Sequence, residues 1–190
     1  MLTGVEIKRK IVHLATLIIP FGYLLTSKET VLTFLIPLAL GLLAVDLLRR
    51  VHPGMASLSR KYFIGRVLRE KESRTLMGST YFLLSTLLVI LLFPKTIAIV
   101  SILILILADT SAAMVGNGIG KIHILGKTLE GSLAFLLCSL IIVWIYPQLN
   151  RVGGSLAALG ATVIELLPVR VDDNFTIPFV AAAIMSFVGA

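Results

Sequence analysis

Residues 97 to 121 read IAIVSILILILADTSAAMVGNGIGK, so an unbroken apolar run ends at the carboxylate of Asp109. A run of this kind is typical of a membrane span, and a charge at the edge of a span indicates a functional site. Two lysines, a second carboxylate and several glycines follow before residue 132. Lysines neutralise phosphate charge, glycines let a backbone approach a polyanion, and carboxylates hold the cation that bridges phosphates. This composition favours the handling of a nucleotide at a membrane surface.

The whole chain is as apolar as that stretch. Of its 190 residues 57% are hydrophobic and only 14% are charged, and the mean hydropathy is +1.01. A soluble domain cannot bury that much apolar surface. We therefore predict an all-α integral membrane protein with one domain over residues 1–190. The single cysteine, Cys138, excludes an intramolecular disulfide and disfavours a cysteine-based metal site.

Apolar segments long enough, or nearly long enough, to be membrane spans recur along the chain. The last two are short, so a bundle of six spans is the alternative to seven. The first is expected to be a retained span rather than a signal peptide, because no small-residue cleavage site follows it cleanly. The expected spans are 11–26, 30–48, 77–93, 95–119, 131–147, 155–167 and 176–190.

The net charge of +7 is distributed unevenly. With a cytoplasmic N-terminus, all of the seventeen lysines and arginines except Lys28, Lys95 and Arg151 lie on the cytoplasmic side. This bias is the signature of membrane topology and of contact with anionic lipids, not of nucleic-acid binding. The sequence thus predicts a cytoplasmic N-terminus and active site, in the cell membrane if the chain is prokaryotic.

The longest polar segment covers residues 49–75. Its apolar residues recur at three- and four-residue steps between basic ones, which indicates a basic amphipathic helix in the cytoplasmic headgroup region. A solvated loop that carries the cytoplasmic charge explains the same pattern equally well.

Small residues recur at every fourth position after Asp109, at Ala112, Gly116 and Gly120. This spacing places them on one helix face, where small side chains let two membrane helices pack closely. Glycines around Asn117 also suit a backbone that cradles phosphate, and both interpretations stay open. The string is not a Walker A loop, because no strand precedes it and the lysine–threonine pair is displaced.

The segment KTLEGS at 127–132 precedes the next apolar run. Gly131 and Ser132 are expected to begin that helix and to direct its free amides and positive dipole end toward phosphate. Lys127 would supply a point charge. Glu130 would bind a metal or orient a hydroxyl, with the raised pKa expected of a carboxylate near a membrane edge. A helix cap with a snorkelling lysine and a first-turn glutamate is the purely structural alternative.

Two further clusters lie on the same side in this topology. Asp172 and Asp173, followed by Asn174, offer hard oxygen ligands suited to Mg²⁺, although a polar turn that caps the last helix fits them too. His13 lies three residues after Lys10 at the start of the first span. A helix-end histidine without a chemical role is the simpler explanation for it.

Together these blocks resemble the polyprenol kinase family, which includes dolichol kinase, phytol kinase and the CTP-dependent diacylglycerol kinase of fungi. The resemblance covers nearly the whole chain in the right order. Its blocks are RKxxH at 9–13, Asp46 with Arg49, GxxYF at 78–82, ADxxAxxxGxxxGK at 108–121, KTxEGS at 127–132, and Glu165 ahead of DDNxxxP at 172–178.

The resemblance implies a membrane enzyme that uses CTP and a divalent cation, such as Mg²⁺, to phosphorylate a lipid alcohol. Phosphoryl transfer requires mainly positioning and charge neutralisation. The expected catalytic residues are Asp109, Lys127 and Glu130; the nucleotide-binding residues are Gly116, Asn117, Gly120, Lys121, Lys127, Thr128, Gly131 and Ser132; the metal ligands are Asp109, Asp172 and Asp173; and the headgroup contacts are Arg9, Lys10 and His13. The lipid tail would lie between spans and reach the site laterally from the bilayer.

Two other functions compete with the kinase. The family is distantly related to phosphatidate cytidylyltransferases, which would form a CDP-lipid from a lipid phosphate, although their long acidic, glycine- and histidine-rich signature is absent here. A transporter would place its polar groups near the bilayer midplane. Polyprenol, dolichol, phytol, geranylgeraniol and diacylglycerol all remain open as substrates, and so does a homo-oligomeric state.

Overall fold

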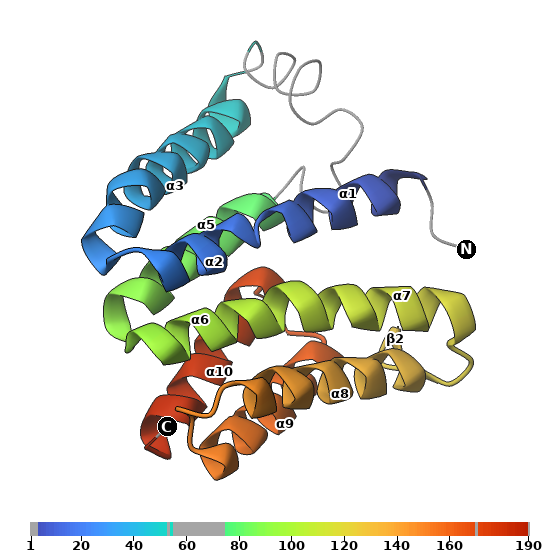
Figure 1. The fold of residues 1–190 in the computed structure, drawn as a ribbon. Coiled ribbons are helices and arrows are strands. Elements are labelled where there is room, and N and C mark those ends of the chain that lie inside the picture. The colour runs from blue at the N-terminus through green and yellow to red at the C-terminus, as the bar shows by residue number, and fades with distance from the viewer. Residues whose placement is uncertain (1–3, 53, 55–74, 170, 190) are drawn as a thin grey trace.

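The computed structural model describes residues 4–52, 54, 75–169 and 171–189, and most of these residues are helical (Figure 1). A short two-stranded hairpin interrupts the helices. The elements are α1 (Gly4–Ala15), α2 (Ile18–Leu25), α3 (Lys28–Val51), α5 (Gly78–Leu92), α6 (Lys95–Leu103), η3 (Ile104–Ala108), α7 (Asp109–Ile119), β1 (His123–Ile124), β2 (Lys127–Thr128), α8 (Leu129–Ile145), α9 (Arg151–Leu166) and α10 (Asp173–Phe187).

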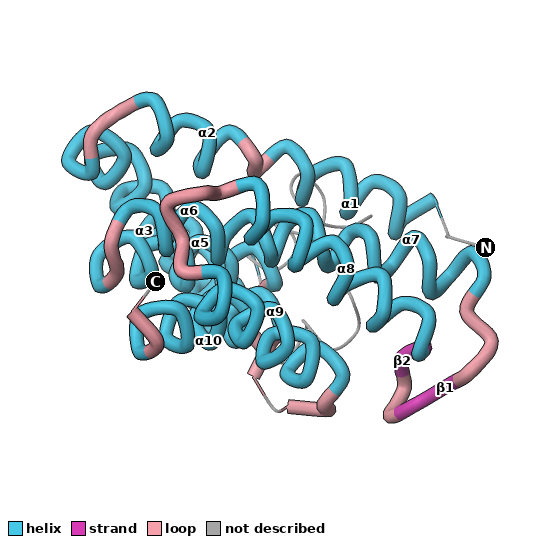
Figure 2. Tube along the Cα trace, turned by 60° about the horizontal axis from the view of Figure 1, so that its bottom comes forward, coloured by secondary structure: helices cyan, strands magenta, loops and turns pink. Residues whose placement is uncertain are grey.

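The stretch from Lys95 to Ile119 forms the central rod of the molecule. α6, the π-helical turn η3 and α7 follow one another without a break, and nearly every side chain from Ile97 to Ala108 is buried. α8 packs along α7 and η3, while α10 contacts α5, α6 and α9. α1 runs beside α7 on another side of the rod (Figures 1 and 2). The apolar run thus belongs to the most buried helix of the bundle.

Side-chain caps fix where several helices begin. Ser27, Thr128, Asn150 and Asp172 each accept a hydrogen bond from an amide of the following first turn. Such caps satisfy donors that have no partner inside the helix. The short polar runs between the apolar segments therefore set the helix boundaries.

Two helices in the described part are long and apolar enough to cross a membrane: Lys28–Val51 and Lys95–Ile119. Gly78–Leu92, Leu129–Ile145 and Asp173–Phe187 are apolar but shorter. Large apolar side chains face outward on several helices, including Phe34 on α3 and Phe187 on α10. The predicted all-α architecture is confirmed, whereas these helices do not establish a bundle of seven membrane spans.

The expected first span, 11–26, is two helices rather than one. α1 ends at Ala15 and α2 begins at Ile18. Pro20 has no amide to donate to the carbonyl of Thr16, and the Thr16 hydroxyl turns back to bond the carbonyl of His13. The helix therefore breaks at this point. The basic amphipathic helix predicted within 49–75 lies largely outside the described residues.

Candidate functional site

A cavity of about 1070 Å³ lies among α1, α5, α7, α8, the hairpin and the segment that leads into α10. The hairpin that lines part of it lies on the same side of the molecule as the N-terminus (Figure 2). Its wall contains both polar and apolar side chains. The predicted site residues that line it are Arg9, Lys10, His13, Asp109, Gly116, Asn117, Lys127, Thr128, Gly131, Ser132, Asp172 and Asp173.

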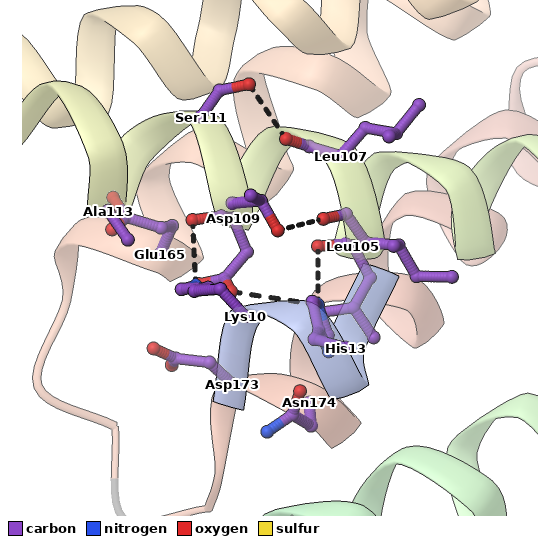
Figure 3. Close-up of polar contacts among 12 residues, drawn as sticks. Lys10, His13, Leu105, Leu107, Asp109, Ser111, Ala113, Glu165, Asp173 and Asn174 are labelled. Atoms are coloured by element: carbon purple, nitrogen blue, oxygen red, sulfur yellow. Dashed lines mark hydrogen bonds and ion pairs between the residues drawn. The ribbon is translucent and has the colours of Figure 1, made fainter. Parts of the chain in front are cut away.

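Asp109 pairs with α1 across the cavity. The Lys10 ammonium donates to Oδ2 of Asp109 at 2.5 Å and to its backbone carbonyl at 3.2 Å. His13 Nε2 lies 3.7 Å from the same Oδ2 and 3.4 Å from the carbonyl oxygen of Leu105 (Figure 3). The π-helical turn that ends at Ala108 changes the direction in which the following side chains project around the helix axis, just before Asp109. Such turns often occur at functional sites. The partner of the charge at the end of the apolar run is thus a lysine 99 residues away.

Lys127 forms a second charged cluster on the same wall. Its ammonium lies 2.9 Å from Oε1 of Glu165 and 2.8 Å from Oδ2 of Asp173. Ser132 donates to the other oxygen of Glu165 at 2.9 Å. Burial lowers the pKa of Lys127, but its hydrogen bonds to Asp173 and Glu165 and their charges raise that pKa by more. Lys127 is therefore held firmly as a cation.

A tight hairpin places Lys127 in the cavity. Ile124 pairs with Lys127 and His123 with Thr128, and Leu125 and Gly126 both have positive φ in the turn between the strands. Two central residues with positive φ are the mark of the turn that best matches strand twist. The sequence predicted only a loop here, because strands of two residues leave no periodic pattern.

The glycines of α7 and α8 let these helices approach closely at Thr128. A Cβ on Gly131 would lie 2.9 Å from the carbonyl oxygen of Ala112, and one on Gly116 would lie 2.6 Å from the Thr128 hydroxyl. That hydroxyl accepts from the amide of Gly131, so Thr128 is the cap of α8. In the structure the small residues therefore allow α7 and α8 to pack closely. Gly116 and Gly131 also line the cavity.

Three predicted residues do not line the cavity: Gly120, Lys121 and Glu130. The Lys121 side chain is exposed. Glu130 accepts from the amide of Ile122 at 3.3 Å. Hydrogen bonds from its own amide and from those of Lys121 and Ile122 lower the pKa of Glu130, where the sequence predicted a raised pKa. Glu130 is one residue away from Gly131, and a helix turns by about 100° per residue, so the carboxylate faces another direction.

The three predicted metal ligands are not gathered into one site. Among the residues that the structure describes, no three or more His, Cys, Asp or Glu side chains lie close enough together to hold a metal ion. Oδ1 of Asp172 caps α10 through the amide and side chain of Asn174, which is the structural alternative stated above. Asp109 and Asp173 pair with different lysines instead.

Two buried acidic residues have roles that the sequence did not assign. Glu165 is almost fully buried and anchors both Lys127 and Ser132. Asp46 is fully buried on α3, where it pairs with Arg49 and accepts from the Met77 amide at 2.7 Å and the Thr80 hydroxyl at 2.8 Å. Asp46 thereby ties α3 to the start of α5. The only local signal for either residue was a carboxylate inside an apolar helix.

The chain is similar to several proteins over most of its length. An uncharacterized protein of Rickettsia prowazekii is 32% identical over 183 residues, which cover 91% of this chain and 89% of that protein. The CTP-dependent diacylglycerol kinase 1 of Schizosaccharomyces pombe is 30% identical over 159 residues, with coverages of 74% and 72%. The enzyme of the same name from Saccharomyces cerevisiae is 27% identical and aligns with 98% of this chain and 74% of its own length. No family model and no solved structure matches the chain.

Proposed function

Because the chain belongs to the family of the CTP-dependent diacylglycerol kinases, within the polyprenol kinases, we propose that it transfers the γ-phosphoryl group of CTP to the hydroxyl of a membrane lipid alcohol. Diacylglycerol is the first acceptor to consider, since it is the substrate in the names of these relatives. Polyprenol, dolichol, phytol and geranylgeraniol rank behind it. The named relatives do not favour cytidylyl transfer.

One observation carries the proposal: charged residues from distant parts of the chain meet in one cavity that also has apolar side chains in its wall. Lys10, Asp109, Lys127, Glu165 and Asp173 come from α1, α7, the hairpin, α9 and α10. A packed core gains nothing from gathering these charges, because buried ion pairs seldom stabilise a fold. A substrate with a polyanionic part and an apolar part matches both kinds of side chain.

The charge of Lys127 suits the nucleotide. Lys127 is held by Glu165 and Asp173 and presents a fixed positive charge to the cavity. Phosphoryl transfer needs little covalent help from a protein, because charge neutralisation and alignment of the reacting oxygens supply most of the rate. In the proposal Lys127 neutralises charge on the phosphates of CTP. Lys121, outside the cavity, has no part in this step.

The acidic residues fit a cation that is shared with the nucleotide. Mg²⁺ is usually bound through one or two carboxylates together with substrate phosphates and waters, not by a cage of protein ligands alone. Asp109 and Asp173 both line the cavity and offer such oxygens. Bound there, the cation would neutralise further charge on the triphosphate.

The remaining step is the attack of the lipid hydroxyl on CTP. The hydroxyl oxygen attacks the γ-phosphorus, the bond to the β-phosphate oxygen breaks, and CDP leaves. The hydroxyl proton passes to a cavity carboxylate, which we assign to Asp109 or Asp173 because Glu130 lies outside the cavity. Arg9, Lys10 and His13 contact the lipid headgroup, and the cavity opens at the cytoplasmic side of the membrane.

A transfer assay on the purified protein tests this function. CTP labelled at either the γ or the α position is offered with diacylglycerol, the isoprenoid alcohols or phosphatidate. We expect label in the lipid product only from the γ position, and most of it with diacylglycerol. Label that reaches lipid from the α position would identify a cytidylyltransferase instead.

A further inference from the structure

Apolar side chains from four helices form part of the lining of the cavity. Its lining includes Val12, Ile18, Leu38, Phe82 and Leu83, from α1, α2, α3 and α5. Phe82 and Leu83 are buried and form its inner surface. They adjoin the charged groups, because the Phe82 ring lies 5.9 Å from the ring of His13, and His13 Nε2 is 3.7 Å from Oδ2 of Asp109.

Three of these lining residues are also exposed. Val12, Ile18 and Leu38 are 59%, 76% and 56% exposed, so the cavity is open to the surroundings where they lie. Leu38 lies near the middle of α3, one of the two helices long and apolar enough to cross a membrane. An opening at that height faces hydrocarbon when α3 spans a bilayer, because a span has its middle residues at the bilayer centre.

We propose that the hydrocarbon chains of the lipid substrate extend through this opening, with Ile18 and Leu38 as the contacts on its two sides. The inference rests on the proposed function and specifies where in the fold the acceptor enters. A water-soluble acceptor has no reason to use an opening at this depth. An amphiphilic lipid fits the cavity and its opening together. Its hydroxyl lies at Lys10 and Asp109, and its chains lie between α2 and α3.

α3 also provides the control needed to test this route. Leu38 and Leu40 are both leucines on the exposed surface of α3, at 56% and 55% exposure, but only Leu38 lines the cavity. Tryptophan at position 38 narrows the opening, whereas tryptophan at position 40 adds bulk elsewhere on the same helix. Ile18→Trp narrows the opening from its other side.

The experiment measures kcat/KM for dioleoylglycerol and for dibutyrylglycerol, whose chains are too short to leave the cavity. Because the indole ring would obstruct the path of the long chains, we expect Leu38→Trp and Ile18→Trp each to lower kcat/KM for the long-chain lipid about tenfold. Dibutyrylglycerol should be phosphorylated within about twofold of the unaltered rate, since the polar wall is intact. Leu40→Trp should change neither value.

Equal losses for both lipids, or no loss in either variant, would overturn the route. Unaltered protein that phosphorylates neither lipid would instead refute diacylglycerol as the acceptor in the proposed function. A second measurement does not depend on turnover or on the tryptophan variants: diacylglycerol with a photoreactive group in mid-chain is cross-linked to the unaltered protein. We expect competable labelling of the peptides that contain Ile18 and Leu38; competable labelling confined to other helices would contradict the proposal.

Discussion

Asp109 is tolerated at the end of an apolar run because Lys10 and His13 face it from α1. Asn in its place keeps the size but leaves the Lys10 ammonium without its counter-ion, and breaking such a pair costs several kcal/mol. Asp109 is also a proposed proton acceptor, and proton transfer by a positioned side chain contributes about 100- to 10,000-fold, so we expect Asp109→Asn to lower kcat at least about 100-fold. Phosphoryl transfer and size-exclusion elution in detergent are measured together. A folded variant with near-normal turnover would remove Asp109 from the site.

Glu165 acts in this account through Lys127 and Ser132. Glu165→Gln keeps the hydrogen bond from Ser132 but removes the charge that holds Lys127, which then has only Asp173. Hydrogen bonds to charged groups contribute about 1.5–3 kcal/mol, so we expect a loss of about 10- to 100-fold in kcat/KM for CTP. The KM for the lipid should stay unchanged. Parallel losses for nucleotide and lipid would show a purely structural role.

At the scale of single residues, the sequence predicts candidate site residues but not the partners that they contact. Asp109, Lys127 and Asp173 could be chosen as candidates because each is a charge at the edge of an apolar segment. Their partners could not, since each ion pair joins residues far apart in the chain and depends on helix packing. Glu130 is also a charge at the edge of an apolar segment. Its position around the axis of α8, however, directs its carboxylate to the amide of Ile122 and not into the cavity.

At the scale of elements, α7 and α8 depend on glycine where they meet. Alanine at position 131 would press against the backbone of α7, which cannot move aside as a side chain can. We expect Gly131→Ala to destabilise the protein by about 1–3 kcal/mol, through overpacking. Thermal unfolding in detergent should report a lower Tm.

Gly118 is the matched control on α7, because a Cβ there would meet nothing within 4 Å. Glycine inside a helix costs about 0.5–1 kcal/mol relative to alanine, so Gly118→Ala should leave the Tm unchanged or raise it. Equal losses of stability in the two variants would show that close packing of α7 and α8 is not the reason for glycine at position 131.

The elements also show where prediction from sequence ends. Apolar runs and the polar residues between them locate the helices well, since burial and capping act locally. The break between α1 and α2 was not predicted, because the apolar segment 11–26 predicts one span. The hairpin was missed because its two-residue strands leave no periodic pattern and a leucine at positive φ is uncommon.

At the scale of the whole molecule, the two ends of the bundle differ in charge. The N-terminus and the hairpin, which carries Lys127, lie at one end, whereas the α2–α3, α5–α6 and α8–α9 turns gather at the other end (Figure 1). There Lys28 and Lys95 donate to the carbonyls of Leu91 and Thr26, both at 2.8 Å. This arrangement suits the charge asymmetry from which the orientation was predicted.

Site-specific labelling tests that orientation. In a Cys138→Ser background, single cysteines replace Leu125 at the hairpin tip and Gln148 in the α8–α9 turn, both of which are exposed. A membrane-impermeant maleimide should label Gln148→Cys from outside intact cells and Leu125→Cys only after the cells are opened. Labelling of both positions from the same side would contradict the predicted topology.

The central claim is that this cavity, rather than the basic charge of the loop around it, handles the nucleotide. Lys121 and Lys127 lie six residues apart, yet only Lys127 lines the cavity. The decisive measurement is γ-phosphoryl transfer from CTP to diacylglycerol by Lys127→Ala and Lys121→Ala, each purified in folded form. We expect Lys127→Ala to lose about 100-fold or more and Lys121→Ala to stay within about twofold, since a transition-state charge contact is worth at least 2.7 kcal/mol. Equal losses, or a loss only in Lys121→Ala, would contradict the account.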